Sequence, residues 1–309
     1  MAYMAPKVRG VFTLDSKPED KTTFSLAVDI CFCTVAYCPA TGHLGASRYV
    51  THIGKGWKVC IWTFNPRGTL QLSFEIAGYN KGRVDSLAFS PDGRSLVANI
   101  MAGDLAGVTC PIDIVKTRNG GRRAEDGRLR FIPGNNRLVS SGFMDGKIRV
   151  WAPDNARGFR ETQVLEEESV SPRDVGVSSL SLSSDGKWLA WVNHVATTIR
   201  IWAVDANEVW RLIQKMESRD NRLRIWSVAF SPGVGQLQLL AGCSEGAILS
   251  WVARDGGKLE PAPIRNGPLR DDTKPAVEEL YFSPDGSYLA TIDASKSLAV
   301  WKVGSVETT

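Results

Sequence analysis

The sequence predicts an all-β fold in which one small antiparallel sheet is repeated along the chain, and three observations support this prediction. The segment AFSPDGRSLVA (88–98) returns near the C-terminus as YFSPDGSYLAT (281–291). Each copy is a short apolar run, a turn and a second apolar run, and Asp-Gly between two such runs is a strong hairpin signal. A third apolar run ending in tryptophan follows at five places, and these residues are Trp62, Trp151, Trp202, Trp251 and Trp301.

Less regular copies of the same hairpin fill the rest of the chain. They begin at Val35 (VAYCPATGHLGAS), Arg130 (RFIPGNNRLVSSG), Leu180 (LSLSSDGKWLAW) and Val228 (VAFSPGVGQLQLLAG). The cycle that contains 88–98 has lost its tryptophan, and its third strand is expected at LAGVTC (105–110). The chain therefore contains six cycles of about 50 residues, a period typical of repeat arrays that fold as one body.

A fourth, outer strand is expected after four of the tryptophans. The segments are 69–77, 158–167, 207–216 and 257–265, and the two prolines of the last indicate an exposed edge. The segment 207–219 could also form a short helix, but its place in the cycle predicts a strand. Only eight residues follow Trp301. We therefore expect the N-terminal run Val8 to Leu14 to pair with the last sheet and cover its open edge.

The hairpin turns, the second strands and the I-x-V/I-W third strands resemble those of WD-repeat β-propellers over residues 28–303. The resemblance implies a single β-propeller of four-stranded antiparallel blades, with six blades counted and seven possible, closed by the N-terminal strand. Residues 1–27 then form that closing strand and a loop, residues 28–303 form the blades, and residues 304–309 form a tail.

The sequence departs from the family pattern at the residues that give the family its name. No aspartate follows any of the five tryptophans, and no Gly-His pair precedes an inner strand. The buried Asp–His–Ser/Thr–Trp hydrogen-bond network that the resemblance implies is therefore incomplete, with Ser140, Asp145 and Trp151 as a remnant.

No motif for catalysis, metal binding or cofactor binding occurs. The only histidines are His43, His52 and His194, and the six cysteines lack the C-x₂-C pairs of a zinc site. Neither a nucleophile elbow nor a phosphate-binding loop is present. We expect no catalytic residue, metal or cofactor. With no secretory leader and no apolar run of membrane-spanning length, we expect a cytoplasmic or nuclear protein with reduced, buried cysteines and no membrane contact.

The loops that join an outer strand to the next inner strand are expected to share one face of the propeller. Acidic residues dilute their charge, the net charge is only +4, and no aromatic residues are interleaved, so nucleic-acid binding is not expected. This face is either ordinary solvated surface or a binding face for an acidic protein or peptide. Its basic residues are Lys81, Arg83, Arg118, Arg122, Arg123, Arg219, Arg222, Arg265 and Arg270.

Further charged residues lie at or near the starts of inner strands, which places some of them around the mouth of the central channel. They include Asp85, Arg128, Arg130, Glu278 and Glu279. They could form a structural ion network or line a small-molecule pocket. The leading interpretation is a protein- or peptide-binding scaffold that uses the loop-rich face. The alternative is small-molecule binding or enzymatic activity at the channel mouth, because a fold alone does not fix a function.

Overall fold

The structure is a computed structural model in which the chain divides into two compact units, Met1–Arg123 and Ala124–Thr309. It describes residues 31–38, 40–41, 43–50, 56–64, 69–79, 84–100, 113–116, 128–141, 146–153, 159–165, 176–193, 197–217, 223–232, 237–253, 257–262, 274–295 and 297–303.

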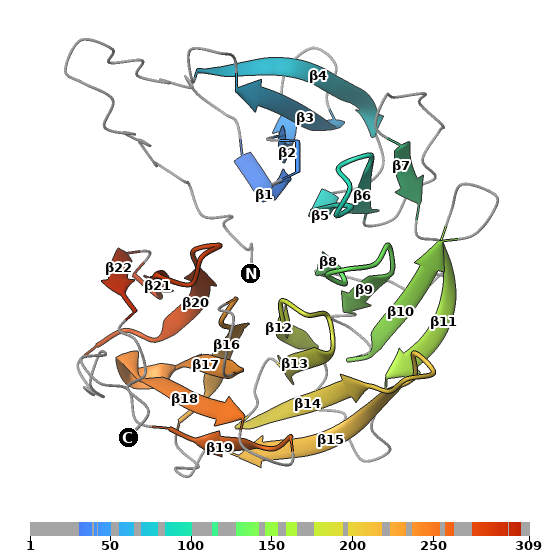
Figure 1. Ribbon diagram of the computed structural model, residues 1–309. Helices are drawn as coiled ribbons and strands as arrows, with labels where there is room; N and C mark the ends of the chain where they lie inside the picture. The colour runs from blue at the N-terminus through green and yellow to red at the C-terminus, as the bar shows by residue number, and fades with distance from the viewer. Residues whose placement is uncertain are drawn as a thin grey trace. The chain divides into compact units, whose positions relative to one another are not determined.

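The first unit contains two small sheets (Figure 1). Its four-stranded antiparallel sheet consists of β1 (Cys31–Cys38), β2 (His43–Val50), β3 (Gly56–Phe64) and β4 (Leu70–Tyr79). Its three-stranded sheet consists of β5 (Val84–Phe89), β6 (Ser95–Ile100) and β7 (Asp113–Lys116).

The second unit contains four antiparallel sheets. The first consists of β8 (Leu129–Phe131), β9 (Leu138–Ser141), β10 (Ile148–Pro153) and β11 (Phe159–Leu165). The second consists of β12 (Val177–Leu182), β13 (Trp188–Asn193), β14 (Thr198–Val204) and β15 (Trp210–Glu217). The third consists of β16 (Ile225–Phe230), β17 (Gln238–Cys243), β18 (Ile248–Ala253) and β19 (Leu259–Pro261), and the last of β20 (Val277–Phe282), β21 (Tyr288–Asp293) and β22 (Leu298–Lys302).

These four sheets follow one another around a common centre, with β8, β12, β16 and β20 innermost (Figure 1). Apolar side chains alternate along the strands, so each sheet can present an apolar surface to its neighbour. One buried cluster joins Val150 of β10 to Trp191 of β13, and a second joins Ile201 of β14 to Val228 of β16. A third joins Leu240 of β17 to Leu280 of β20. The core of this unit therefore lies between successive sheets.

The expectation of six four-stranded antiparallel blades is correct only in part. Five of the six described sheets are antiparallel, and four of these have four strands. The sheet of β5, β6 and β7 departs from the pattern because β7 pairs with β6 in parallel. Parallel pairing needs a crossover of about a dozen residues or more, and residues 101–112, which include the third strand expected at 105–110, separate β6 from β7. The described residues contain no seventh sheet, and the predicted closing strand Val8 to Leu14 lies outside them.

The segment that could have been a short helix is strand β15, as its place in the cycle predicted. Buried Trp210 and Met216 lie at its two ends, and exposed and half-exposed residues alternate between them. A half-buried outer strand has this period of two. The described part of the chain contains no α-helix, only a short 3-10 turn at Ser244–Gly246.

The recurring tryptophans occupy one register position in the sheets. Trp151, Trp202 and Trp251 are buried, each next to a leucine on the second strand. The Trp151 indole N–H donates to the hydroxyl of Ser140 at 2.9 Å, which confirms this part of the predicted remnant network. Asp145 lies outside the described residues.

Candidate functional site

The structure describes only part of the predicted site. All nine basic loop residues (Lys81, Arg83, Arg118, Arg122, Arg123, Arg219, Arg222, Arg265 and Arg270) lie outside the described residues. Asp85 lies in β5 of the first unit. In the second unit, Arg128 directly precedes β8, and Glu278 and Glu279 lie in β20.

A β-bulge recurs at the start of the inner strands and separates the two predicted glutamates. The ladder between β20 and β21 shifts between Val277 and Glu279, so Glu278 is the extra residue. The same shift in β5 makes Asp85 the extra residue of its sheet. A bulge disrupts the ladder locally and changes the direction of a side chain. Sequence alternation alone therefore could not assign Glu278 and Asp85 to a face.

Four residues on the first and last inner strands of the second unit form what we call the inner-strand cluster: Arg128, Arg130, Glu279 and Tyr281. Residues two apart on a strand lie on the same side, and buried Leu129 and Leu280 lie between the members of each pair. The Tyr281 hydroxyl donates to the Glu279 carboxylate. Partial burial of the half-exposed Tyr281, the Glu279 charge and this hydrogen bond raise the pKa of Tyr281 to about 12, while Arg128 and Arg130 act in the opposite direction.

The same neighbouring charges also shift the pKa of Arg130. Burial and the charge of Arg128 lower the pKa of Arg130, whereas Tyr281 and Glu279 raise it. The structure thus brings the predicted Arg128, Arg130 and Glu279 into one electrostatic environment and adds Tyr281. A repeat alignment could have found Tyr281, because it occupies the same place in its hairpin, YFSPD, as Arg130 in RFIPG.

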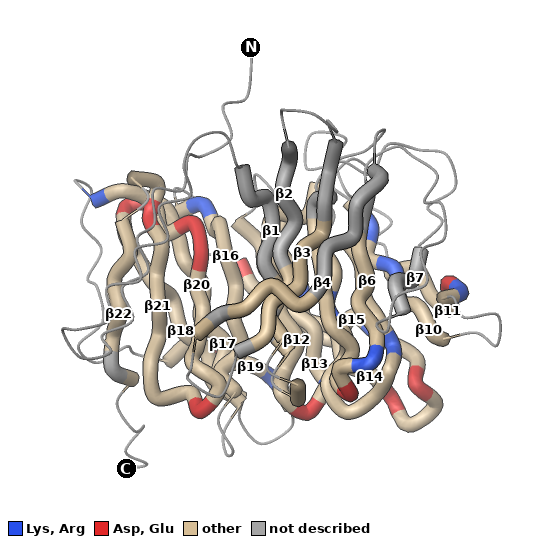
Figure 2. The backbone as a smooth tube through the Cα atoms, turned by 90° about the horizontal axis from the view of Figure 1, so that it is seen from above, with Lys and Arg blue, Asp and Glu red and all other residues tan. Residues whose placement is uncertain are grey.

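A second feature, which the sequence did not reveal, is a groove of about 210 Å³ that we call the turn groove. It lies where three turns of the first two sheets of the second unit meet. Figure 2 shows acidic residues in the turns at one end of the strands of this unit. The groove is lined by Ile132, Pro133, Gly134, Asn135, Arg137, Asp185, Gly186, Lys187, Val204, Asp205, Glu208 and Trp210.

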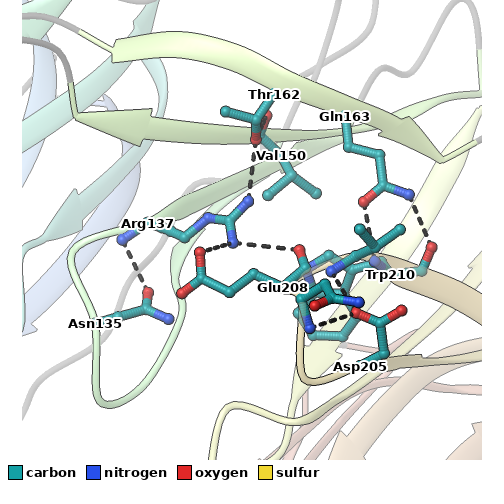
Figure 3. A network of polar contacts seen from close by, with 10 residues as sticks. Asn135, Arg137, Val150, Thr162, Gln163, Asp205, Glu208 and Trp210 are labelled. Atoms are coloured by element: carbon teal, nitrogen blue, oxygen red, sulfur yellow. Dashed lines mark hydrogen bonds and ion pairs between the residues drawn. The ribbon is translucent and has the colours of Figure 1, made fainter.

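Arg137 joins the two sheets at this groove (Figure 3). Its Nη1 donates to the Glu208 carboxylate at 2.9 Å and to the Glu208 carbonyl at 3.3 Å, and its Nη2 donates to the Thr162 hydroxyl at 3.2 Å. The Arg137 side chain is only 14% exposed, whereas that of Glu208 is 70% exposed. A largely buried guanidinium with three acceptors fixes the relative position of the turns.

The turn carboxylates of the groove hold their own turns. Asp185 Oδ1 accepts from the Ser183 hydroxyl at 2.5 Å and from the Lys187 amide at 3.0 Å. Asp205 accepts from the amides of Asn207 and Val209 and from Arg211. The Val209 amide is the main cause that lowers the pKa of Asp205, and Arg211 adds to it. Such Asx turns fix the backbone locally.

Gly186 is required at the floor of the turn groove for two reasons. Its φ of +69° lies in the left-handed region, which side chains disfavour. A Cβ at this position would also lie 2.4 Å from the Pro133 carbonyl oxygen of the neighbouring turn. The Asp-Gly turn thus allows the two sheets to approach closely, a role that the hairpin signal alone does not reveal.

Two glutamines on outer strands connect each sheet to the next. The Gln163 side chain donates to the Trp210 carbonyl at 2.8 Å and accepts from the Trp210 amide at 3.0 Å (Figure 3). Gln214 makes the same pair of bonds to Leu259, at 2.8 and 2.9 Å. Each glutamine directly follows the extra residue of a bulge, Thr162 or Ile213, beside the recurring tryptophan. Sequence reasoning missed these bridges because their partners are backbone groups about one repeat away.

The described residues offer no group of three metal-ligating side chains and no helix with the length and apolar character needed to cross a membrane. The two features described above can bind a partner through hydrogen bonds and charge. The turn groove presents a cation and carboxylates on a rigid frame, and the inner-strand cluster presents two guanidinium groups beside a tyrosine and a glutamate.

Comparison with known proteins identifies one repeat by sequence and the fold by structure. The family model for the "WD domain, G-beta repeat" matches residues 127–152, which include β8, β9 and most of β10. No curated protein matches the sequence.

Solved structures with the same fold include both WD-repeat proteins and lactonases. Sqt1 from Chaetomium thermophilum matches with a TM-score of 0.58 and 17% identity, over 90% of this chain and 70% of that one. The propeller domain of Cps50 (Swd1) from Myceliophteria thermophila matches with a TM-score of 0.57 and 15% identity, over 89% and 85%. The periplasmic gluconolactonase PpgL of Pseudomonas aeruginosa matches with a TM-score of 0.58 and 17% identity, over 87% and 80%.

At these identities the structural likeness establishes the fold alone, a β-propeller, and it does not separate a binding protein from an enzyme. The sequence match adds a recognised repeat inside that fold, and its Ser140–Trp151 hydrogen bond is present. Together these findings show a β-propeller fold that contains one recognised WD repeat at residues 127–152.

Proposed function

We propose that this chain is a protein-interaction scaffold that holds an acidic protein or peptide. The WD-repeat propeller fold supports a scaffold role, and so do its solved neighbours Sqt1 and Swd1, which have the same fold. The observation that carries the proposal is the turn groove, because its size and its rigidity both suit a partner side chain.

The size of the turn groove favours a protein partner over a cofactor-sized ligand. Sites for small molecules usually enclose about 300–1,000 Å³, whereas this groove holds about 210 Å³. Its three turns are held by Arg137, Asp185 and Asp205 before any partner arrives. A site that is already ordered loses little conformational entropy on binding.

The acidic character of the partner rests on the sequence. The predicted loop face carries nine basic residues, and electrostatic complementarity speeds encounter and improves specificity. Two surfaces therefore contribute to the proposal: the predicted basic loop face and the turn groove.

The test is affinity purification with the full chain as bait, followed by quantitative mass spectrometry. One variant reverses three basic loop residues, Arg118→Glu, Arg122→Glu and Arg123→Glu, and a second carries Lys187→Glu in the turn groove. The matched control reverses three exposed cations outside both surfaces, Arg94→Glu, Arg160→Glu and Lys258→Glu.

We expect partners that bind the wild-type chain and the control triple variant but are lost with the loop triple variant. Direct binding of one such partner to the purified chain, measured by titration calorimetry, then completes the test. The proposal is overturned if no protein depends on either surface, with circular dichroism showing that the variants keep their strand content.

A further inference from the structure

The inner-strand cluster contains two guanidinium groups that no carboxylate in the described part of the chain neutralises at close range. The Glu279 carboxylate accepts from the Tyr281 hydroxyl, and Arg130 donates through Nη1 to the backbone carbonyl of Leu129 at 2.8 Å. Among the described residues, Arg128 and Arg130 have no ion pair within 4.0 Å. Arg128 uses its backbone, not its guanidinium, to bond Ser141.

Comparison with an equivalent strand shows that the sheet can form without arginines at these positions. The hairpin ladders give Arg128 and Arg130 the same register as Ser179 and Ser181 on β12. The two serines connect inner strands, because their hydroxyls accept from the amides of Val228 (3.1 Å) and Phe230 (3.0 Å). Strand β12 therefore forms with small residues at these two positions. The fold does not require a pair of arginines there.

The electrostatics of the cluster disfavour this pair of charges in the absence of an anion. Burial and the charge of Arg128 both lower the pKa of Arg130, which means that the protonated guanidinium is poorly compensated. A partly buried cation usually finds a hydrogen-bonded anionic partner. Guanidinium groups two residues apart on one strand side can bind the oxygens of one phosphate or carboxylate together.

We propose that Arg128 and Arg130 form a binding site for an oxyanion, the phosphate or carboxylate group of a ligand, at the start of the inner strand β8. The Tyr281–Glu279 pair on β20 forms the opposite side of this site. Its carboxylate favours a ligand that also carries a hydrogen-bond donor. This site shares no residue with the predicted basic loop face or with the turn groove, so its test is independent of the scaffold role.

The test uses the full chain with two probes, inorganic phosphate and succinate, at an ionic strength held constant with sodium chloride. Binding is followed by titration calorimetry and by the Nε–Hε resonances of the arginine side chains. We expect saturable binding of at least one probe with shifts at Arg128 and Arg130. Phosphate binding alone indicates a phosphorylated ligand, and succinate binding alone indicates a carboxylate ligand, such as an acidic side chain; both results support the site.

Two variants and a control make the assignment specific. Arg130→Gln and Arg128→Gln are each expected to weaken probe binding at least tenfold. The control is Arg160→Gln, which replaces an exposed arginine on β11 and is expected to leave probe binding unchanged. If Arg130→Gln does not fold, Arg130→Lys keeps the charge but removes the planar fork, and a smaller loss of affinity is expected. The site is refuted if neither probe saturates, or if the glutamine variants bind as well as the wild-type chain.

Discussion

Arg137 donates to both the carboxylate and the backbone carbonyl of Glu208, a residue held in the left-handed conformation at φ 61°. Only two described non-glycine residues have positive φ, and the other is Glu245. A left-handed backbone costs a residue with a Cβ about 1–2 kcal/mol. The bonds from Arg137 offset this cost, and they hold the turn that forms one side of the turn groove.

This relationship predicts an unusual order of stability at position 208. Glu208→Ala loses the ion pair and keeps the strained backbone, whereas Glu208→Gly loses the same ion pair but relieves the strain. We expect the glycine variant to be more stable than the alanine variant by about 1 kcal/mol. Urea denaturation of both measures the difference, and an alanine variant as stable as the glycine variant would show that the turn is not strained.

Removing a glutamine bridge should weaken the contact between two sheets. Gln163→Leu leaves the amide and the carbonyl of Trp210 without these partners, and we expect a loss of about 1–3 kcal/mol in the free energy of unfolding. Gln214→Leu should cause a similar loss, because it removes the same two bonds to Leu259. The double variant should show nearly additive losses in the free energy of unfolding, because the two bridges share no partner. Arg160→Leu on the same strand is the control, expected within about 0.5 kcal/mol of wild type.

The hydrogen bond between Ser140 and Trp151 is buried, so its loss should be costly. In Ser140→Ala the indole N–H loses its acceptor, and we expect a loss of about 1–3 kcal/mol in the free energy of unfolding. Thr291→Ala removes the equivalent bond to Trp301, which is 3.2 Å long and only partly buried, and should cost less. Thermal unfolding of the two variants compares them, and equal losses would contradict this assignment.

The turn carboxylate of Asp285 should titrate far below its usual range. Hydrogen bonds from the Ser283 hydroxyl, then from the Ser287 hydroxyl and amide, lower the pKa of Asp285 to about 2. Because the folded pKa is depressed, the stabilisation is present above the unfolded value and is lost as pH falls from about 4 toward 2. Ser283→Ala should raise the pKa toward 3.8, measured by NMR titration of the carboxyl carbon. An unchanged pKa would mean that Ser283 is not its main partner.

Cys38, Cys60 and Cys243 are buried and take part in no disulfide among the described residues, which agrees with the sequence expectation for these three thiols. Burial raises the pKa of Cys243 to about 12. Since the thiolate is the reactive form, we expect Cys243 to resist a maleimide in the folded chain and to react once the chain is unfolded in urea. Mass spectrometry of the labelled protein reads this out, and labelling of Cys243 under native conditions would contradict its burial.

The sequence by itself determined the repeat: the hairpins with their Ser-Pro-Asp-Gly turns, the third strands that end in tryptophan, and the outer strands, including β15. These features are local, since periodicity and turn chemistry act within about ten residues. The tertiary structure decided the rest. It made β7 parallel, placed Glu278 and Asp85 in bulges, formed the turn groove around Arg137 and Glu208, and brought Arg130 near Tyr281. The groups in each of these arrangements lie on different strands, and only the stacking of the sheets within a unit brings them together.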